Sequence, residues 1–210
     1  MKISILCTDP MHPVNAWLER WMEDHAVCHE IMLARRASEI KSGDILFLVS
    51  CHEIIPKHVR DLFRYSLVLH ASALPSGKGM SPHIWQILEG KNLITLSMIN
   101  AEDQLDAGNI WQQKSVLFEG HELYDEINAR IFEAEIELMS WALENIDQNK
   151  PWSQKGEGSY YRKRLPRDSQ IDPEKTIAAQ FNLLRVADSS RYPAFFEHRG
   201  RKYKILIEKI

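Results

Sequence analysis

The chain has 210 residues, of which 44% are apolar and 26% are charged, and its formal net charge is −3. This composition argues against a disordered chain, and the weak negative charge argues against a partner made of nucleic acid, because proteins that bind polynucleotides usually carry a strong positive charge. Three cysteines without paired CxxC spacing argue against a disulfide framework and a zinc knuckle, so we expect no metal ion.

Short apolar runs alternate with amphipathic stretches through the first 150 residues, which is the pattern of β-α-β units around a mostly parallel sheet. The helix expected at 81–90 begins with Ser81-Pro82 and ends at Gly90, residues that favour helix starts and stops. In chain order, strands are expected at residues 2–7, 43–50, 66–72, 92–99 and 110–118, and helices at residues 15–32, 56–65, 81–90 and 122–146. The sequence therefore predicts an α/β fold with a Rossmann-like sheet.

The composition changes after residue 147. Residues 148–173 are rich in Gln, Lys, Gly, Ser, Arg and Pro, which is typical of a linker or a long surface loop. A short helix is expected at 174–188, and a β-hairpin at 194–210 with its turn at Arg199-Gly200. We therefore expect a catalytic domain over 1–150 and a small α+β unit over 151–210.

Several common cofactor motifs are missing from the sequence. The segment after the first predicted strand, CTDPMHPVNAW, contains no glycine, so the backbone there lacks the GxGxxG loop that binds a dinucleotide. The sequence also has no GxxxxGK[ST] phosphate loop and no HExxH zinc motif. These absences argue against NAD, FAD, ATP and zinc chemistry.

His70 and Asp106 are the pair of residues that most suggests catalysis. His70 ends a predicted strand, at the sheet edge where open α/β sheets bind ligands, and Asp106 lies in a glycine-containing turn between two later strands. An imidazole can move a proton near neutral pH, and a carboxylate can orient it and stabilise its charged form. A buried structural histidine and a turn aspartate are the alternative interpretation.

The segment around these two residues resembles the formyltransferase family that uses 10-formyltetrahydrofolate. The family pattern runs Asn-x-His-x-Ser-x-Leu-Pro, then a basic residue and Gly before a Pro-initiated helix, then Asp-x-Gly. The matching positions are His70, Ser72, Leu74, Pro75, Lys78, Gly79, Pro82, Asp106 and Gly108, and the spacing of 36 positions from histidine to aspartate agrees with the family. The family asparagine, however, falls at Val68, and valine cannot donate a hydrogen bond to a developing oxyanion.

This resemblance implies how the donor would be bound. The family fold places 10-formyltetrahydrofolate, a co-substrate that needs no metal, along two loops. In this chain those loops hold the expected donor-binding residues Ser50, His52, Ile55, Ser72, Leu74, Pro75 and Lys78. His70 and Asp106 would be catalytic, and Ser72 or Asn100 are considered as donors that replace the missing asparagine.

The C-terminal stretch, RLPRDSQIDPEKTIAAQFNLLRVADSSRYPAFF, resembles the corresponding part of sugar N-formyltransferases. Those enzymes formylate the 4-amino group of a UDP-linked 4-amino-4,6-dideoxy sugar, as in pseudaminic-acid-type pathways. The resemblance implies a nucleotide-sugar acceptor, with Arg185, Arg191 and Tyr192 as its binding residues. A structural ion pair is the alternative for Arg185.

Two other functions stay open on the sequence alone. The same histidine and aspartate would serve a 10-formyltetrahydrofolate hydrolase, and Val68 leaves open an inactive module that binds folate or a nucleotide. No run approaches the roughly 20 apolar residues of a membrane span, and the first apolar run, Ile3–Cys7, is too short for a signal sequence. We therefore expect a cytoplasmic protein without membrane contact, and the edge of the C-terminal hairpin leaves a homodimer open.

Overall fold

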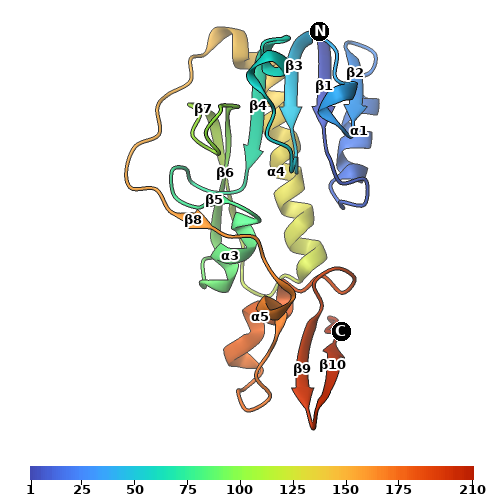
Figure 1. Ribbon diagram of the computed structural model, residues 1–210, viewed down its shortest axis with the longest axis vertical. Coiled ribbons are helices and arrows are strands. Elements are labelled where there is room, and N and C mark those ends of the chain that lie inside the picture. The colour runs from blue at the N-terminus through green and yellow to red at the C-terminus, as the bar shows by residue number, and fades with distance from the viewer.

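A six-stranded mixed sheet forms the centre of the computed structural model, which describes residues 1–210 (Figure 1). Its strands are β1 (Lys2–Leu6), β2 (Glu30–Ala34), β3 (Gly43–Leu48), β4 (Phe63–His70), β6 (Leu93–Asn100) and β7 (Ile110–Leu117), in the order β2-β1-β3-β4-β6-β7. The first four are parallel, whereas β6 is antiparallel to both of its neighbours. The parallel strands therefore all end at one edge, which faces the C-terminal unit (Figure 1).

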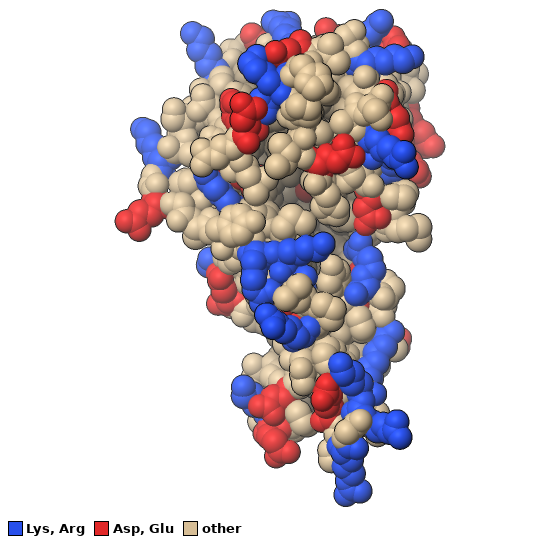
Figure 2. All heavy atoms as spheres, viewed as in Figure 1, with Lys and Arg blue, Asp and Glu red and all other residues tan.

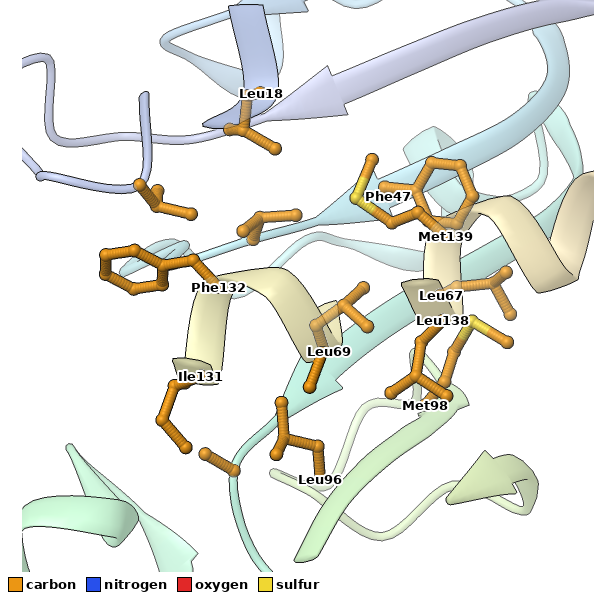
Figure 3. Packing of buried hydrophobic residues seen from close by; sticks show 14 of the residues in the cluster. Leu18, Phe47, Leu67, Leu69, Leu96, Met98, Ile131, Phe132, Leu138 and Met139 are labelled. Carbon is orange, nitrogen blue, oxygen red and sulfur yellow. The ribbon is translucent and has the colours of Figure 1, made fainter. Parts of the chain in front are cut away.

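The main core lies between this sheet and two helices, α1 (Asn15–His25) and α4 (Tyr124–Asn145). Figure 3 shows side chains of α4, among them Phe132 and Met139, against residues of the sheet such as Phe47 and Leu69. Burial of such apolar side chains contributes about 1.5–3 kcal/mol each. A smaller cluster covers the opposite face, where Leu46, Leu48 and Phe63 pack with residues of the loops and of the 3₁₀ helix η1 (Ala37–Glu39).

The predicted α/β fold with a mostly parallel sheet is confirmed. Two predicted helices are shorter than expected, and the residues after each one form strands instead. The helix predicted at 15–32 ends at His25, and Glu30–Ala34 pairs with β1 as the edge strand β2. The helix predicted at 56–65 is a single turn, α2 (Lys57–Arg60), because β4 already begins at Phe63 and pairs with β3. In both places backbone pairing with a neighbouring strand outweighs helical spacing of the apolar residues. The helix α3 (Pro82–Leu88) begins at Pro82 as predicted.

The segment after α4 returns along the sheet domain before it reaches the C-terminal unit (Figure 1). After the 3₁₀ helix η2 (Ile146–Gln148), Trp152 bridges to Ile110, and the short strand β8 (Tyr160–Tyr161) pairs with β5 (Lys78–Gly79). The segment is thus fastened to the loop that follows His70.

The C-terminal unit contains two 3₁₀ helices, a short helix and the predicted hairpin. These elements are η3 (Pro166–Ser169), η4 (Ala178–Gln180), α5 (Phe181–Arg185), β9 (Ala194–His198) and β10 (Arg201–Ile205). Arg199 and Gly200 both have positive φ, 47° and 72°, as a two-residue hairpin turn requires. The hairpin prediction is therefore confirmed, whereas the domain division at residue 150 stays a prediction. No helix in the protein is sufficiently long and apolar to cross a bilayer.

Gly108 provides a test of the loop between β6 and β7. A Cβ atom at this position would lie 1.9 Å from the carbonyl oxygen of Asn100, which is backbone and cannot rotate away. We expect Gly108→Ala to lower the melting temperature by several degrees, about 1–3 kcal/mol of strain, because the loop must move. At Gly158 the nearest atom to an added Cβ is 3.4 Å away, so Gly158→Ala should melt like the wild type. Equal melting temperatures for the two variants would contradict this account of the loop.

Candidate active site

A cleft of about 700 Å³ opens at the edge where the parallel strands end. Loops that follow β1, β3, β4 and β6 line it on one side, and the inner face of α4 and the C-terminal unit line it on the other. Open α/β sheets usually bind their ligands at this edge, because the loops there converge without secondary-structure constraints. The candidate site is therefore built from segments that are far apart in the sequence.

His70 ends β4 inside this cleft, with 7% of its surface exposed. Its Nε2 lies 2.9 Å from the carbonyl oxygen of Gly77, and its Nδ1 lies 3.6 Å from Asp106 Oδ1. A carbonyl oxygen only accepts hydrogen bonds, so Nε2 carries a hydrogen. Nδ1 is consequently the ring nitrogen that is left to exchange a proton, and the carboxylate beside it stabilises a positive charge on the ring.

Three backbone contacts hold Asp106 in place. Asp106 has a positive φ of 50°, and its Oδ2 accepts a hydrogen bond of 2.8 Å from the backbone N–H of Gly79. The side-chain amide of Gln154 donates to the carbonyl oxygens of Asp106 and Gly108, at 2.9 and 2.8 Å. Gln154 is one of the residues that sequence reasoning missed, because a glutamine in a polar linker gives no signal of its own.

Three of the expected donor-binding residues line the cleft. Ser50, His52 and Ile55 belong to the loop after β3, and the backbone N–H of His52 donates to Thr8 Oγ1 at 2.9 Å. The loop after β6, residues 101–106, lines the same part of the cleft. These two loops therefore form the walls on either side of Val68 and His70.

The other four expected donor-binding residues, Ser72, Leu74, Pro75 and Lys78, lie behind His70 and outside the cleft lining. Ser72 is 1% exposed, and Leu74 packs against Ile99 and Ile110. The carbonyl oxygen of Pro75 and the backbone N–H of Lys78 both bond to Ser159. The loop thus packs against the chain segment after α4 and positions Gly77 beside His70, and direct contact of these four residues with a donor stays a prediction.

Val68 takes the position of the family asparagine on the same face of β4 as His70, two residues away. It is half-buried and packs with apolar residues on both sides of the strand. Asn100 pairs with Leu67 and so lies on the opposite face of the sheet, where its Oδ1 accepts from Trp111 Nε1. Ser72 is buried outside the cleft lining, whereas Asn100 and His70 both line the cleft. Of these two, His70 shares the face of β4 with Val68.

Arg191 and Tyr192 both line the cleft, but the guanidinium of Arg191 already has three protein partners, two of which are carboxylates. Its Nε donates to Asp188, its Nη1 to Asp9 and its Nη2 to the Tyr124 hydroxyl, at 2.7, 3.2 and 3.0 Å. Burial opposes the ionisation of Asp188, yet hydrogen bonds from Arg191 and Ser190 outweigh it and lower the pKa of this carboxyl. Arg191 therefore ties the C-terminal unit to the sheet domain.

Arg185 does not reach the cleft. It is 1% exposed, its Nη1 lies 3.7 Å from Glu122, and its Nε and Nη2 donate to Asn182 and Asn92. It lines a second cavity, of about 780 Å³, formed with the C-terminal unit, and its contact with a substrate stays a prediction beside the structural alternative.

Three further ionisable residues line the cleft without a clear signal in the sequence. Burial raises the pKa of Glu135 on α4 to about 8, and this carboxyl makes no hydrogen bond. Burial, with the charges of His12, Arg164 and His70, lowers the pKa of His83 to about 3. Burial and the charge of Arg191 lower the pKa of His12 to about 4. All three groups are therefore mainly uncharged near neutral pH.

Sequence comparison finds relatives for more than half of the chain. A family model described as formyl transferase matches residues 27–143. A methionyl-tRNA formyltransferase of Prochlorococcus marinus is 30% identical over 110 residues, which cover 52% of this chain and 34% of that protein. A second one, from Fusobacterium nucleatum, is 27% identical over 172 residues, 80% of this chain and 55% of that protein. The chain thus spans from a third to just over half of the length of these curated relatives.

Solved structures with the same fold cover nearly the whole chain. A methionyl-tRNA formyltransferase from Clostridium thermocellum superimposes with a TM-score of 0.85 at 20% identity, over 100% of this chain and 93% of that one. HypX from Aquifex aeolicus in complex with tetrahydrofolic acid gives 0.83 at 20% identity, over 99% of this chain and 37% of that one. A sugar N-formyltransferase from a Shewanella species superimposes with a TM-score of 0.76 at 14% identity, over 100% of this chain and 99% of that one. At these identities the likeness concerns the fold, and it agrees with the sheet described above.

The buried carboxyl of Glu135 predicts a pH-dependent effect on stability. Its pKa is about 8 in the folded protein against 4.5 in the unfolded chain, so the folded protein binds more protons between these values and loses stability as the pH rises through them. We expect Glu135→Gln to melt like the wild type at pH 4.5 and at least about 3 °C higher at pH 8.5. Glu133→Gln, an exposed change on the same helix, should give no such difference between the two pH values. If Glu135→Gln changed the melting temperature by the same amount at both pH values, the carboxyl of Glu135 would not be protonated in the folded protein.

Proposed function

The chain belongs to the formyl transferase family, and we propose that it transfers a formyl group from 10-formyltetrahydrofolate to the amino group of an acceptor. The observation that carries this proposal is the meeting of His70 and Asp106 in one cleft, at 3.6 Å, from positions 36 residues apart. Both side chains are more than nine-tenths buried and each is fixed by a backbone contact. Such fixation is what a proton-transfer site needs, because misplacement by 1 Å costs much of the rate.

The lining of the cleft fits a flat, partly polar ring system such as the pterin of a folate. Leu48, Ile55, Val68 and Ile99 give it apolar surface, and the backbones of the loops at 50–55 and 101–106 flank them. Backbone N–H and C=O groups in loops can pair with the edge of a heterocycle. HypX, which shares this fold over 37% of its chain, forms a complex with tetrahydrofolic acid, and this supports a reduced folate as the donor.

The chemistry of His70 follows from its fixed hydrogen bond. 10-Formyltetrahydrofolate would supply the formyl carbon, to which the acceptor nitrogen forms a bond while the bond from this carbon to N10 of the folate breaks. Nδ1 of His70 is free to take the proton of the attacking amine, directly or through water, and to return it to N10. Asp106 stabilises the positive charge that His70 carries meanwhile, and the charged ring in turn stabilises the formyl oxygen as it becomes negative.

We propose a nucleotide-linked 4-amino-4,6-dideoxy sugar as the acceptor, with UDP as the nucleotide. The sugar N-formyltransferase from Shewanella matches this chain over almost the full length of both, which supports a nucleotide sugar as the acceptor. Methionyl-tRNA is the second candidate, because the curated relatives reported above carry that activity in their names. Hydrolysis of the donor would use the same residues with water in place of the amine.

A single-turnover assay distinguishes these functions. The full chain is mixed with 10-formyltetrahydrofolate and either the UDP-linked amino sugar, methionyl-tRNA or buffer alone, and products are separated by mass. We expect a formamide on the sugar, no formylmethionyl-tRNA and slow release of formate. Formylation of methionyl-tRNA alone would show that the tRNA, and not the nucleotide sugar, is the acceptor. Folate binding without any product would contradict the proposal that the protein is an enzyme.

Replacement of His70 tests the proton-transfer role. We expect His70→Asn to lower the transfer rate by at least about 100-fold, since a positioned acid or base contributes 10²–10⁴-fold. The melting temperature should change little, because the asparagine amide takes the position of Nδ1 and stays polar beside Asp106. His58→Asn, an exposed change outside the cleft, should behave like the wild type in both assays. Unfolding of the His70 variant, or an unchanged rate, would make His70 a structural residue.

A further inference from the structure

Arg164 is a buried cation in the cleft wall that has no acidic partner. It lies in the segment 162–167, whose other five residues are exposed or mostly exposed, and only 7% of Arg164 is accessible. Its Nη2 donates to Ser169 Oγ at 3.0 Å, and its Nε is buried with no hydrogen-bond partner. A charge removed from water without a compensating charge is strongly unfavourable, so its retention needs an explanation.

The other buried arginines of the protein each have a carboxylate beside them. Arg60 pairs with Asp103, and Arg185 lies 3.7 Å from Glu122. The acid nearest in sequence to Arg164 is Asp168, but both of its oxygens accept hydrogen bonds from Arg162, at 2.6 and 2.7 Å. The protein therefore supplies carboxylates to its structural arginines and leaves this one without.

Arg164 lies in the lining of the cleft and is not part of the hydrophobic core. Its guanidinium lies over the ring of Tyr192, 5.5 Å from the centroid, and both residues line the cleft that holds His70. Lys163, also in the lining, adds a second positive charge. His83 also lines the cleft, and its pKa is lowered by burial and, to a smaller degree, by the charges of groups that include Arg164 and His70. Figure 2 shows Lys and Arg side chains gathered on this face between the sheet domain and the hairpin.

We propose that Arg164 binds a phosphate group of the acceptor, namely the diphosphate of a small nucleotide, with Tyr192 as the platform that orients the guanidinium. This inference deepens the proposed function and rests on it for the identity of the ligand as the acceptor. A phosphate oxygen would accept hydrogen bonds from the free N–H groups of Arg164 and would compensate its charge, which no carboxylate of the protein does. Arginine suits phosphate binding because its planar guanidinium can donate two parallel hydrogen bonds to phosphate oxygens.

The site also separates two parts of one ligand. Arg164 and Lys163 attract the anionic part to the wall formed by the C-terminal unit, whereas the uncharged His83 and the protonated Glu135 add no negative charge that would repel it. The amine to be formylated is left to face His70. Arg191 lies in the same lining, but its charge is already compensated by the carboxylates of Asp188 and Asp9, so it lacks the unmet need for an anion that Arg164 has.

Binding of inorganic pyrophosphate to the full chain, without donor or acceptor, tests the site independently of catalysis. We expect pyrophosphate and UDP to raise the melting temperature of the wild type in a concentration-dependent manner. Arg164→Met keeps the aliphatic stem but removes the charge, and it should bind pyrophosphate at least about tenfold more weakly. Without ligand this variant should melt at the same temperature as the wild type or above it, because it removes an uncompensated buried charge.

Arg167→Met is the matched control, since it removes the same charge from an exposed position three residues away, outside the cleft lining. It should bind pyrophosphate like the wild type. Equal weakening in both variants would show general surface attraction, and unweakened binding in Arg164→Met would make Arg164 structural; either result overturns the proposal. If Arg164→Met does not fold, hydrogen exchange on the wild type decides: pyrophosphate must slow exchange in residues 162–169 and around Tyr192, and unchanged exchange there overturns the proposal.

Kinetics then link the site to the acceptor. If the chain formylates the nucleotide sugar, Arg164→Met should raise the KM for it about tenfold or more and leave the KM for 10-formyltetrahydrofolate unchanged. An unchanged acceptor KM would overturn the proposal even though the proposed function stands. Conversely, absence of any transfer would end the proposed function, while Arg164-dependent pyrophosphate binding would still support the anion site. Arg164-dependent binding of tRNA without binding of pyrophosphate or UDP would overturn the assignment of a small diphosphate.

Discussion

The site depends on one constraint: the loop between β6 and β7 folds back toward the end of β4 and brings Asp106 beside His70. Between Asn100 and Ile110 the chain turns back so tightly that Gly108 packs against the carbonyl group of Asn100. A side chain at position 108 would have no room there. Gln154 fastens this loop through two backbone carbonyls, and Gly79 fixes the Asp106 carboxylate with its N–H. Asp106 is therefore held beside Nδ1 of His70 by a backbone N–H on its carboxylate and by the Gln154 side chain on its loop.

The charges in the cleft fall into two groups with different physical roles. Arg191, Asp188 and Asp9 satisfy one another and join the C-terminal unit to the loop after β1. Arg164 and Glu135 have no charged partner although both are buried, and each stays there at a cost in stability. Such uncompensated groups are typical of binding sites, where the ligand completes what the protein leaves unpaired. The contrast separates the residues that hold the cleft together from those that can recognise a molecule in it.

The C-terminal unit belongs to the site as much as the sheet does. It supplies Arg164 and Tyr192 to one wall of the cleft, and the linker before it supplies Gln154 and the strand that fastens the loop after His70. Val68 offers no amide donor to the cleft, so under the proposed function a negative oxygen would have to be stabilised by other lining groups such as His70 and Asn100. Differences in this unit among formyl transferases of one fold therefore offer a physical basis for different acceptors.

Local patterns in the sequence determined the strands that form the centre of the sheet, the long helix α4, the hairpin turn at Arg199-Gly200 and the candidate pair His70 and Asp106. Each of these depends on residues close in the chain or on a motif read in order: apolar alternation, a glycine that accepts positive φ, a histidine at a strand end. The sequence did not separate strand β2 from the helix before it, because a short apolar run fits both until a neighbouring strand offers its backbone. Only the tertiary structure decided that Ser72, Leu74, Pro75 and Lys78 lie outside the cleft lining, that Arg185 is buried beside Glu122, and that Arg164 and Glu135 line the cleft without charged partners. The physical reason is that burial and charge pairing join residues far apart in the chain, 182 positions for Arg191 and Asp9, so the chemistry of a charged side chain is fixed only when the chain has folded around it.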